Sequence, residues 1–407
     1  MTITCGIDWA EVHHDVALVD EAGQRVAKLR IDTGAKGFGE LLDLLAEHAD
    51  EPLEVPVAIE TDKGLLVAAL RAAGMVLYAI NPRAVARYRE RHGQAGGKSD
   101  PVDAMVLADI LRIDRDHHRP LPELSEEALA VKVLARQHQE TIWTRQAAVN
   151  RLRSLLVEFY PNALVAFPNL THKAALEVLA AAPTPTAGSK LTARRVTALL
   201  RRSGRGDRPG LAERIVTALR APALHQPERV EAAFGHVVSS LVATIGVMQT
   251  GIAELETAMT AEFDAHPDAA ILTPAPGLGP VLAARVLGEI GDDRARFPGA
   301  ENLRAFAGTA PITKASGRTK VVRARHIRNR RLADACHWWA FAAITKSPGA
   351  RAHYDRRRAA GDTHNAALRH LANKLLGRLW WCWQHHQPWD DNAAWPELHK
   401  SANQIAA

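Results

Sequence analysis

The chain has 407 residues, enough for two or three domains at about 100–200 residues each. Apolar residues make up 47% and charged residues 24%, which is ordinary for a folded globular protein and excludes a mostly disordered one. The longest apolar runs fall far short of the roughly 20 residues of a membrane span, so we expect no membrane partner. No basic segment precedes the first apolar stretch, which argues against a secretory signal.

The cysteines indicate the compartment. Cys5, Cys336 and Cys382 are far apart in the sequence and odd in number. They fit neither a disulfide framework nor a C-x-x-C metal site. We therefore expect a reducing environment and a cytoplasmic location.

The net charge of +6 is unevenly distributed. Residues 1–60 hold 4 Lys or Arg against 13 Asp or Glu, whereas the rest of the chain holds 47 against 32. A basic body suits a polyanionic partner such as nucleic acid, and the acidic head needs another explanation.

The first domain, residues 1–120, is predicted to be α/β. Short apolar or alternating segments indicate strands, the second and third of which form a hairpin, and segments with helical spacing separate the later ones. Three meandering strands followed by alternating helices and strands predict a mixed sheet with helices on its faces. The expected strands are 3–7, 14–19, 26–31, 55–59 and 75–80, and the expected helices are 38–48, 65–73 and 100–112.

The second domain, residues 121–268, is predicted to be built from long helices. Its second half carries a heptad seam of about 3.5 residues per repeat, typical of a coiled coil. Between the long helices, 183–227 is rich in Pro, Gly, Thr and Arg, and we expect a loop-rich insertion there that contains one short helix-like piece at 191–200. The seam consists of Phe234, Val238, Leu241, Ile245, Met248, Ile252, Leu255 and Met259.

The third domain, residues 269–390, is predicted to be helical. Its segment 276–280, Pro-Gly-Leu-Gly-Pro, precedes a helix and predicts a helix-hairpin-helix-like element. A second helix from about residue 301, a loop that contains Ser316, and Trp-rich helices over 332–345 and 364–384 follow. Residues 391–407 are expected to form a frayed tail.

Four acids in the first domain are suggestively placed. Asp8 and Glu60 end apolar strands, and Asp100 and Asp103 begin a helix with i,i+3 spacing. Carboxylates converging at strand ends would suit Mg²⁺ or Mn²⁺, which could clamp a scissile phosphate. The alternative is that Asp100 and Asp103 only cap the helix, with Pro101 at its first position.

Two features of the third domain could contact phosphate. Gly277 and Gly279 lie before a helix, where backbone N–H groups can meet an anion, although they could equally form a simple tight turn. A dense run of bases surrounds Ser316 and Gly317. Such a run is usually a solvated face, but because it contains no acid it suits phosphate binding. A serine beside arginines could attack phosphorus, although most loop serines do not. The bases of this run are Lys314, Arg318, Lys320, Arg323, Arg325, Arg328, Arg330 and Arg331.

Taken in order, these motifs resemble the DEDD transposases of bacterial insertion sequences, the family numbered one-ten. The N-terminal motifs are Gly-Ile-Asp ending at Asp8, Ala-Ile-Glu ending at Glu60, and Asp-Pro-Val-Asp over 100–103. The C-terminal ones are 276–280, 308–311 (Gly-Thr-Ala-Pro) and 316–317 (Ser-Gly). The N-terminal half of that family resembles the RuvC Holliday-junction resolvase.

The resemblance implies an RNase H-like fold in which Asp8, Glu60, Asp100 and Asp103 bind Mg²⁺ or Mn²⁺. It also implies that Ser316 attacks DNA covalently, that donor and target DNA are partners, and that a bridge RNA encoded by the element guides the enzyme. Because the acids and the serine lie far apart with a coiled coil between them, we expect a homodimer or homotetramer joined through the long helices.

Two other functions stay open at this point. A RuvC-like nuclease specific for DNA structure would explain the acids but give Ser316 no role. An actin-like or sugar-kinase ATPase also begins with a Gly-Ile-Asp strand, but it needs a second Gly-rich phosphate loop, which 1–160 lacks.

Overall fold

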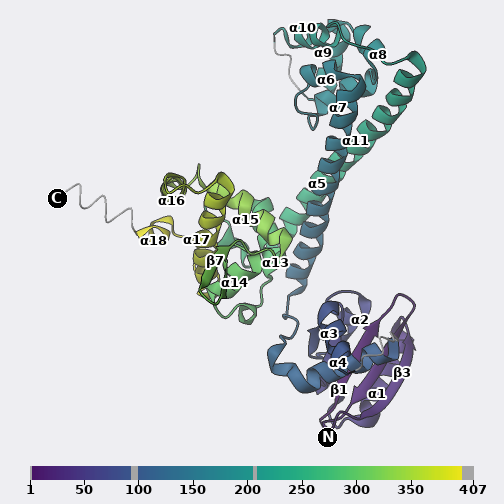
Figure 1. Cartoon of the computed structure of the whole chain (residues 1–407), viewed down its shortest axis with the longest axis vertical. Helices are drawn as coiled ribbons and strands as arrows, with labels where there is room; N and C mark the ends of the chain where they lie inside the picture. The colour runs from purple at the N-terminus through teal and green to yellow at the C-terminus, as the bar shows by residue number, and fades with distance from the viewer. Residues whose placement is uncertain (1, 93–99, 205–208, 397–407) are drawn as a thin grey trace, which may run out of the picture. The chain divides into compact units, whose positions relative to one another are not determined.

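The computed structural model describes residues 2–92, 100–204 and 209–396, and it describes only the backbone at 91–92 and 100–101. The chain divides into two compact units, Met1–Glu123 and Leu124–Ala407 (Figure 1). The first contains a five-stranded sheet and the second is mainly helical. This agrees with the expected pairing of an α/β region with an α-helical one.

The sheet of unit 1 is mixed. Its strand order is β3-β2-β1-β4-β5, with β1–β2–β3 antiparallel and β1–β4–β5 parallel. All the strands expected from the sequence are present, although the fourth and fifth are shorter than expected. The strands are β1 (Thr4–Trp9), β2 (His13–Val19), β3 (Arg25–Asp32), β4 (Val57–Ile59) and β5 (Leu77–Ala79).

Helices cover both faces of this sheet. Helices α1 (Ala35–His48) and α2 (Leu65–Ala72) pack on one face, against a core that includes Ile7 and Ile59. The other face packs against α3 (Pro82–His92) and α4 (Asp100–Asp114), with Ala58 and Tyr78 in that core. Short 3₁₀ turns lie at Pro52–Glu54 and Arg115–His117.

Two long helices dominate unit 2. Helix α5 (Glu126–Phe159) and helix α11 (Glu228–Ala265) pack along each other (Figure 1). Along the heptad seam of α11, Val238, Ile245, Ile252 and Met259 are buried and the alternate positions are half-buried. The seam is therefore filled from within the chain, and it does not by itself support the expected oligomer through these helices.

The segment 183–227 is more helical than expected, and its helix-like piece at 191–200 corresponds to α9 (Ala193–Arg202). The segment holds α8 (Pro185–Ser189), α9 and α10 (Leu211–Leu219). With α6 (Pro161–Ala166) and α7 (Lys173–Ala181) they enclose a core of their own. Residues typical of loops act here as helix caps. Thr184 Oγ1 accepts a hydrogen bond from Ala187 N at 3.2 Å and Thr192 Oγ1 one from Arg195 N at 3.2 Å.

The rest of unit 2 is a helical bundle around a large core. A short antiparallel hairpin, β6 (Ile312–Ser316) with β7 (Thr319–Arg323), replaces the loop expected around Ser316. The bundle comprises α12 (Ala269–Leu272), α13 (Pro280–Ile290), a 3₁₀ turn at Arg294–Arg296, α14 (Ala300–Ala307), α15 (Arg330–Ala343), α16 (Pro348–Ala359) and α17 (His364–Gln384).

The expected frayed tail begins later than residue 391. Helix α18 (Asp391–Ala394) is present, and Trp395 is buried against Gly349. Its indole Nε1 donates to Asp391 Oδ1 at 3.0 Å, and this contact fixes the segment. Residues 397–407 lie outside the described part.

Helix α11 is the one described helix that is long and apolar enough to cross a membrane, by length and composition alone. That is weak evidence, because a core helix passes the same test, and α11 packs along α5. Cys5, Cys336 and Cys382 are all free and buried.

Candidate functional site

The first site lies at the carboxyl end of two parallel strands. The register of β1 and β4 pairs Ile7 with Ile59, so the next residues, Asp8 and Glu60, lie beside each other at the same edge of the sheet. Parallel neighbours are about 4.8 Å apart. Side chains alternate along a strand, so Asp8 lies on the face of Gly6, which α4 covers. Both carboxylates are half-buried.

Helix α4 brings the third acid to this face. A Cβ on Gly6 would lie 2.0 Å from Ala104 O, so β1 and α4 are in close backbone contact beside Asp103. Asp103 is 3% exposed, and its Oδ1 forms an ion pair with Arg89 Nη2 of α3. A pocket of about 370 Å³ unites these groups. Its lining consists of Asp8, Trp9, Ala10, Glu60, Pro82, Ala86, Arg89 and Asp103.

The structure thus brings three of the four predicted acids into one pocket. Asp100 is the first residue of α4, but its side chain lies outside the described residues. Within the described part, no three His, Cys, Asp or Glu side chains already form a metal cage. The donor set nevertheless fits a hard divalent cation, because it is all carboxylate. Asp103 Oδ1 is buried, and its ion pair with Arg89 makes it a positioned carboxylate donor at the pocket.

The second site is the β6–β7 hairpin. Ser316 pairs with Thr319, which leaves Gly317 and Arg318 as a two-residue turn. Gly317 has a φ of 53°, and glycine at the first central position is typical of a type II′ turn. Apart from Ile312, every residue of both strands is exposed. A bare two-stranded hairpin is marginal in water, so this arm is suited to being covered by a partner.

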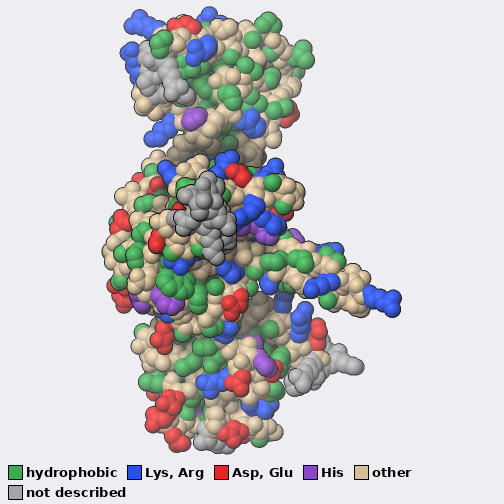
Figure 2. Space-filling model, turned by 90° about the vertical axis from the view of Figure 1, so that its left-hand side faces the viewer, with side chains coloured by type: hydrophobic (Ala, Val, Ile, Leu, Met, Phe, Trp, Pro, Cys, Tyr) green, Lys and Arg blue, Asp and Glu red, His purple; other side chains and the backbone are tan. Residues whose placement is uncertain are grey.

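The arm carries bases on both faces, and Figure 2 shows Lys and Arg side chains on it where it projects from unit 2. Ser316 shares its face with Lys314, about 7 Å along the strand. Arg323, on the same face, pairs with Ile312 and is about twice as far away. Lys320 pairs with Ala315 and therefore lies on the opposite face.

The predicted phosphate-binding bases are unpaired within the described chain, where none of them forms an ion pair with an acid. They are Lys314, Arg318, Lys320, Arg323, Arg325, Arg328 and Arg330. Arg331 differs, because it pairs with Glu140 Oε2 at 2.8 Å and lies over the Trp143 ring. Seven cations without a described counter-ion favour binding of a polyanion.

A buried network holds the base of the arm. Glu289 of α13, 4% exposed, accepts Arg136 Nε and Nη2 of α5 at 2.8 and 2.9 Å. Asn329 Nδ2 donates to the same carboxylate at 2.6 Å. Asn329 Oδ1 also caps α15, accepting from Leu332 N at 2.9 Å. The segment that follows the arm is therefore anchored at Asn329, which bonds to Glu289 of α13 and caps α15.

The two glycines before α13 have different surroundings. A Cβ on Gly277 would lie 2.5 Å from Ala343 N, and its φ is 78°, so packing against α15 is enough to require glycine there. Gly279 is exposed and has no atom within 4 Å of a Cβ position, so it remains open to an anion. The phosphate-binding interpretation is therefore weaker for Gly277 than for Gly279.

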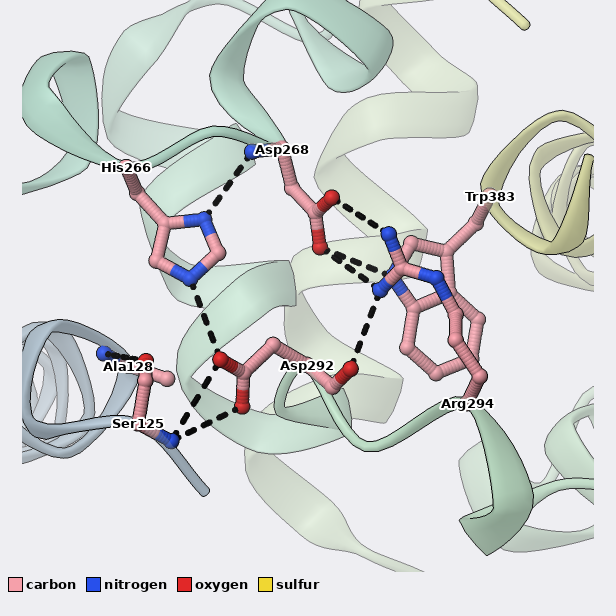
Figure 3. Close-up of polar contacts among 7 residues, drawn as sticks. All are labelled: Ser125, Ala128, His266, Asp268, Asp292, Arg294 and Trp383. Carbon is pink, nitrogen blue, oxygen red and sulfur yellow. Dashed lines mark hydrogen bonds and ion pairs between the residues drawn. The ribbon is translucent and has the colours of Figure 1, made fainter. Parts of the chain in front are cut away.

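A second buried network, drawn in Figure 3, connects the start of α5 to the bundle. Asp268 accepts Arg294 Nη1 at 2.8 Å and Nη2 at 2.5 Å, and Trp383 Nε1 at 2.9 Å. Burial would raise the pKa of Asp268, but these donors lower it below the ordinary value. His266 Nδ1 accepts from Asp268 N at 3.0 Å, so its Nε2–H points at Asp292 Oδ2, 3.4 Å away.

Sequence reasoning missed two residues of the acid pocket, Arg89 and Trp9. Arg89 lies in the strongly basic helix α3, where nothing in the sequence distinguishes it from its neighbours. Trp9 follows Asp8 directly, and an aromatic residue beside a candidate catalytic acid was the available signal.

The chain is similar to known proteins over nearly its whole length. A family model described as "Transposase", of the IS110 DEDD type, matches residues 5–161, and one described as "Transposase IS116/IS110/IS902 family" matches residues 269–355. A Streptomyces coelicolor protein, named as a mini-circle transposase for IS117, is 50% identical over 408 residues, 99% of each chain. A 42 kDa protein of insertion element IS900 from Mycobacterium paratuberculosis is 30% identical over 93% of this chain and 94% of its own. A 43.6 kDa protein of IS110 from Streptomyces coelicolor is 31% identical over 92% of each chain.

Proposed function

Because the chain belongs to the IS110 family of transposases, which cleave and rejoin DNA, we propose that its acid pocket and its Ser316 arm together carry out the strand transfer. The observation that carries the proposal is the pocket shared by Asp8, Glu60 and Asp103. Family membership also removes the ATPase alternative.

The acids are the proposed metal ligands. Asp8, Glu60 and Asp103, with Asp100 as the fourth by family pattern, would hold Mg²⁺ or Mn²⁺. The bound ion would neutralise charge on the scissile phosphate. Arg89 of α3 forms an ion pair with the Asp103 carboxylate at the pocket, so it would orient one of the proposed metal ligands.

Ser316 is the proposed nucleophile. Its Oγ attacks phosphorus in line, an Oγ–P bond forms, and the bond from phosphorus to the 3′-oxygen breaks. The proton leaves Oγ for water and the departing 3′-oxygen takes one up, which gives a phosphoserine and a free 3′-hydroxyl. Attack by another strand's 3′-hydroxyl reverses the step and rejoins the DNA.

The bases nearest Ser316 are proposed to stabilise the negative charge that develops on phosphorus. Strand register favours Lys314, on the same face, and Arg318, in the adjoining turn. Arg323, Arg325, Arg328 and Arg330 then bind the flanking backbone, together with Lys320 on the other face, Gly317 in the turn and Gly279 before α13.

Three other parts of the proposal do not come from the two sites. A bridge RNA that pairs with donor and target DNA rests on the family resemblance. A homodimer or homotetramer rests on the separation of the acids from Ser316 along the chain, and a cytoplasmic location rests on the scattered cysteines. The proposal requires both sites to reach the same phosphate in the assembled complex, from one chain or from two.

Strand cleavage by the full chain tests the acid site. The substrate is DNA that carries the element's ends, with its RNA and Mg²⁺ supplied. We expect Asp8→Asn and Glu60→Gln each to reduce cleavage at least about 1,000-fold. Asp43→Asn, an exposed acid on α1, is the matched control and should cleave normally. Cleavage at the normal rate by Asp8→Asn would exclude the proposed acid site.

A further inference from the structure

A second pocket adjoins the acid pocket and shares two of its residues. It measures about 380 Å³, and its lining consists of Trp9, Glu60, Thr61, Lys63 and Gly64. Trp9 and Glu60 line both pockets. Whatever occupies the second pocket is therefore next to anything bound by the acids.

Trp9 is the unusual member of this lining. It ends β1 with 46% of its surface exposed, although indole is normally well buried. His14, its partner across the β1–β2 pair, stacks on it with ring centroids 6.3 Å apart at 24°. An indole that is supported at one side and exposed at a pocket is available to stack on a planar ligand.

His14 is a rigid support. It is 3% exposed, and its Nδ1 accepts Ala10 N at 3.4 Å. Burial, and then the neighbouring His13, lower the pKa of His14, so the ring stays uncharged at neutral pH.

The rim of the second pocket combines apolar surface with one cation. Leu65, at the start of α2, is 90% exposed, and Lys63 is exposed beside it. A purely ionic ligand would gain nothing from Trp9 and Leu65. The lining instead suits a ligand with an uncharged planar part and an attached negative group.

We propose that this pocket holds one unpaired nucleobase of the DNA strand being cut, stacked on Trp9, with its phosphate near Lys63. The inference rests on the proposed function, because the acid pocket must hold the scissile phosphate for the neighbouring nucleotide to reach Trp9. A base inside a duplex cannot stack on a side chain, so the nucleotide next to the cut is unpaired in the complex. Trp9 is thus a positioning residue that fixes which phosphate lies over the acids.

Photocrosslinking tests the proposal directly. The full chain carrying Ser316→Ala, a change in the other unit that leaves the pocket intact, is bound to a 20-nucleotide single strand containing 5-iododeoxyuridine. After irradiation and trypsin digestion, we expect a crosslink in the peptide Met1–Arg25, whose only tryptophan is Trp9. A strand with abasic sites in place of its bases should bind about 10-fold more weakly.

Substitutions of Trp9, with a matched control, test whether this side chain is responsible for the crosslink. Trp9→Ala should lose the crosslink and the preference for bases, and Trp9→Phe should recover part of that preference. Trp338→Ala, at 49% exposure in unit 2, is the matched control and should keep the Met1–Arg25 crosslink. The crosslink is mapped on a chain that keeps Trp9, so this result stands even if Trp9→Ala does not fold.

Two results would overturn the inference while leaving the proposed function intact. One is a crosslink that maps only elsewhere, and the other is equal binding of the abasic strand, each with cleavage still abolished by Asp8→Asn. If Asp8→Asn cleaves normally, the proposed function itself fails.

Discussion

Gly6 lies where β1 meets α4, so replacing it with alanine should separate two of the elements that carry the proposed acids. A Cβ at this position would lie 2.0 Å from Ala104 O and 2.4 Å from Ala108 N. Real Cβ atoms essentially never approach a heavy atom closer than 3.0 Å, so α4 must move by at least about 1 Å. Both obstacles are backbone atoms, which cannot rotate away as a side chain would.

The energetic cost follows from this overlap. Overpacking a well-packed interface typically costs about 1–3 kcal/mol, and contact with two backbone atoms puts Gly6→Ala near the upper end. The displacement also moves Asp103 away from Asp8. A 1 Å misplacement can cost about 100-fold in rate, so we expect cleavage to fall by roughly that factor in the fraction that remains folded.

Urea unfolding measures the expected loss of stability, and single-turnover cleavage measures the expected loss of rate. Gly39→Ala is the matched control, because Gly39 lies in α1 with no atom within 4 Å of a Cβ. That change should be neutral or stabilise the protein by up to about 1 kcal/mol. If Gly6→Ala matched Gly39→Ala in stability and cleaved at the normal rate, the close contact between β1 and α4 would be wrong.

Three further predictions concern unit 2. Burial lowers the pKa of His138 from 6.5 to about 4. The free energy of unfolding of the wild type, measured in urea, should therefore fall by up to about 3 kcal/mol between pH 6.5 and pH 4. His138→Leu should lack this pH-dependent loss. The donors around Asp268 lower its pKa below the ordinary value, so its contribution to stability is present at neutral pH and is lost as pH falls through the folded-state pKa. By urea unfolding, Asp268→Asn should cost about 3 kcal/mol at pH 7 and progressively less in acid. Lys314→Ala should slow single-turnover cleavage about 10-fold or more, and Lys320→Ala should weaken DNA binding with little change in that rate.

Local signals in the sequence predicted much of unit 1. Alternating and buried-type apolar segments gave every strand, and the strand ends placed Asp8 and Glu60 at one edge of a sheet. The hydrophobic period of a segment and the order of the segments along the chain depend only on local sequence, so both can be determined before the fold is known.

The failures involve contacts distant in sequence. The Thr, Pro and Gly of 183–227 suggested loops, but here Thr184 and Thr192 cap helices whose burial depends on α6 and α7. The heptad seam of α11 showed that a partner helix exists, but no periodicity could show that the partner is α5 of the same chain. Arg89 reaches Asp103 only because α3 and α4 pack side by side.

A covalent bond between Ser316 and DNA distinguishes the proposed mechanism from cleavage by water, and trapping that bond tests it directly. A nicked substrate that loses its 3′-hydroxyl fragment by diffusion should leave the full chain attached to DNA after denaturation, with the phosphate on Ser316 by mass spectrometry. We predict that Ser316→Ala forms no adduct and rejoins no strands, while Ser240→Ala, an exposed serine on α11, behaves as wild type. Strand joining by Ser316→Ala, or an adduct located on another residue, would exclude Ser316 as the nucleophile.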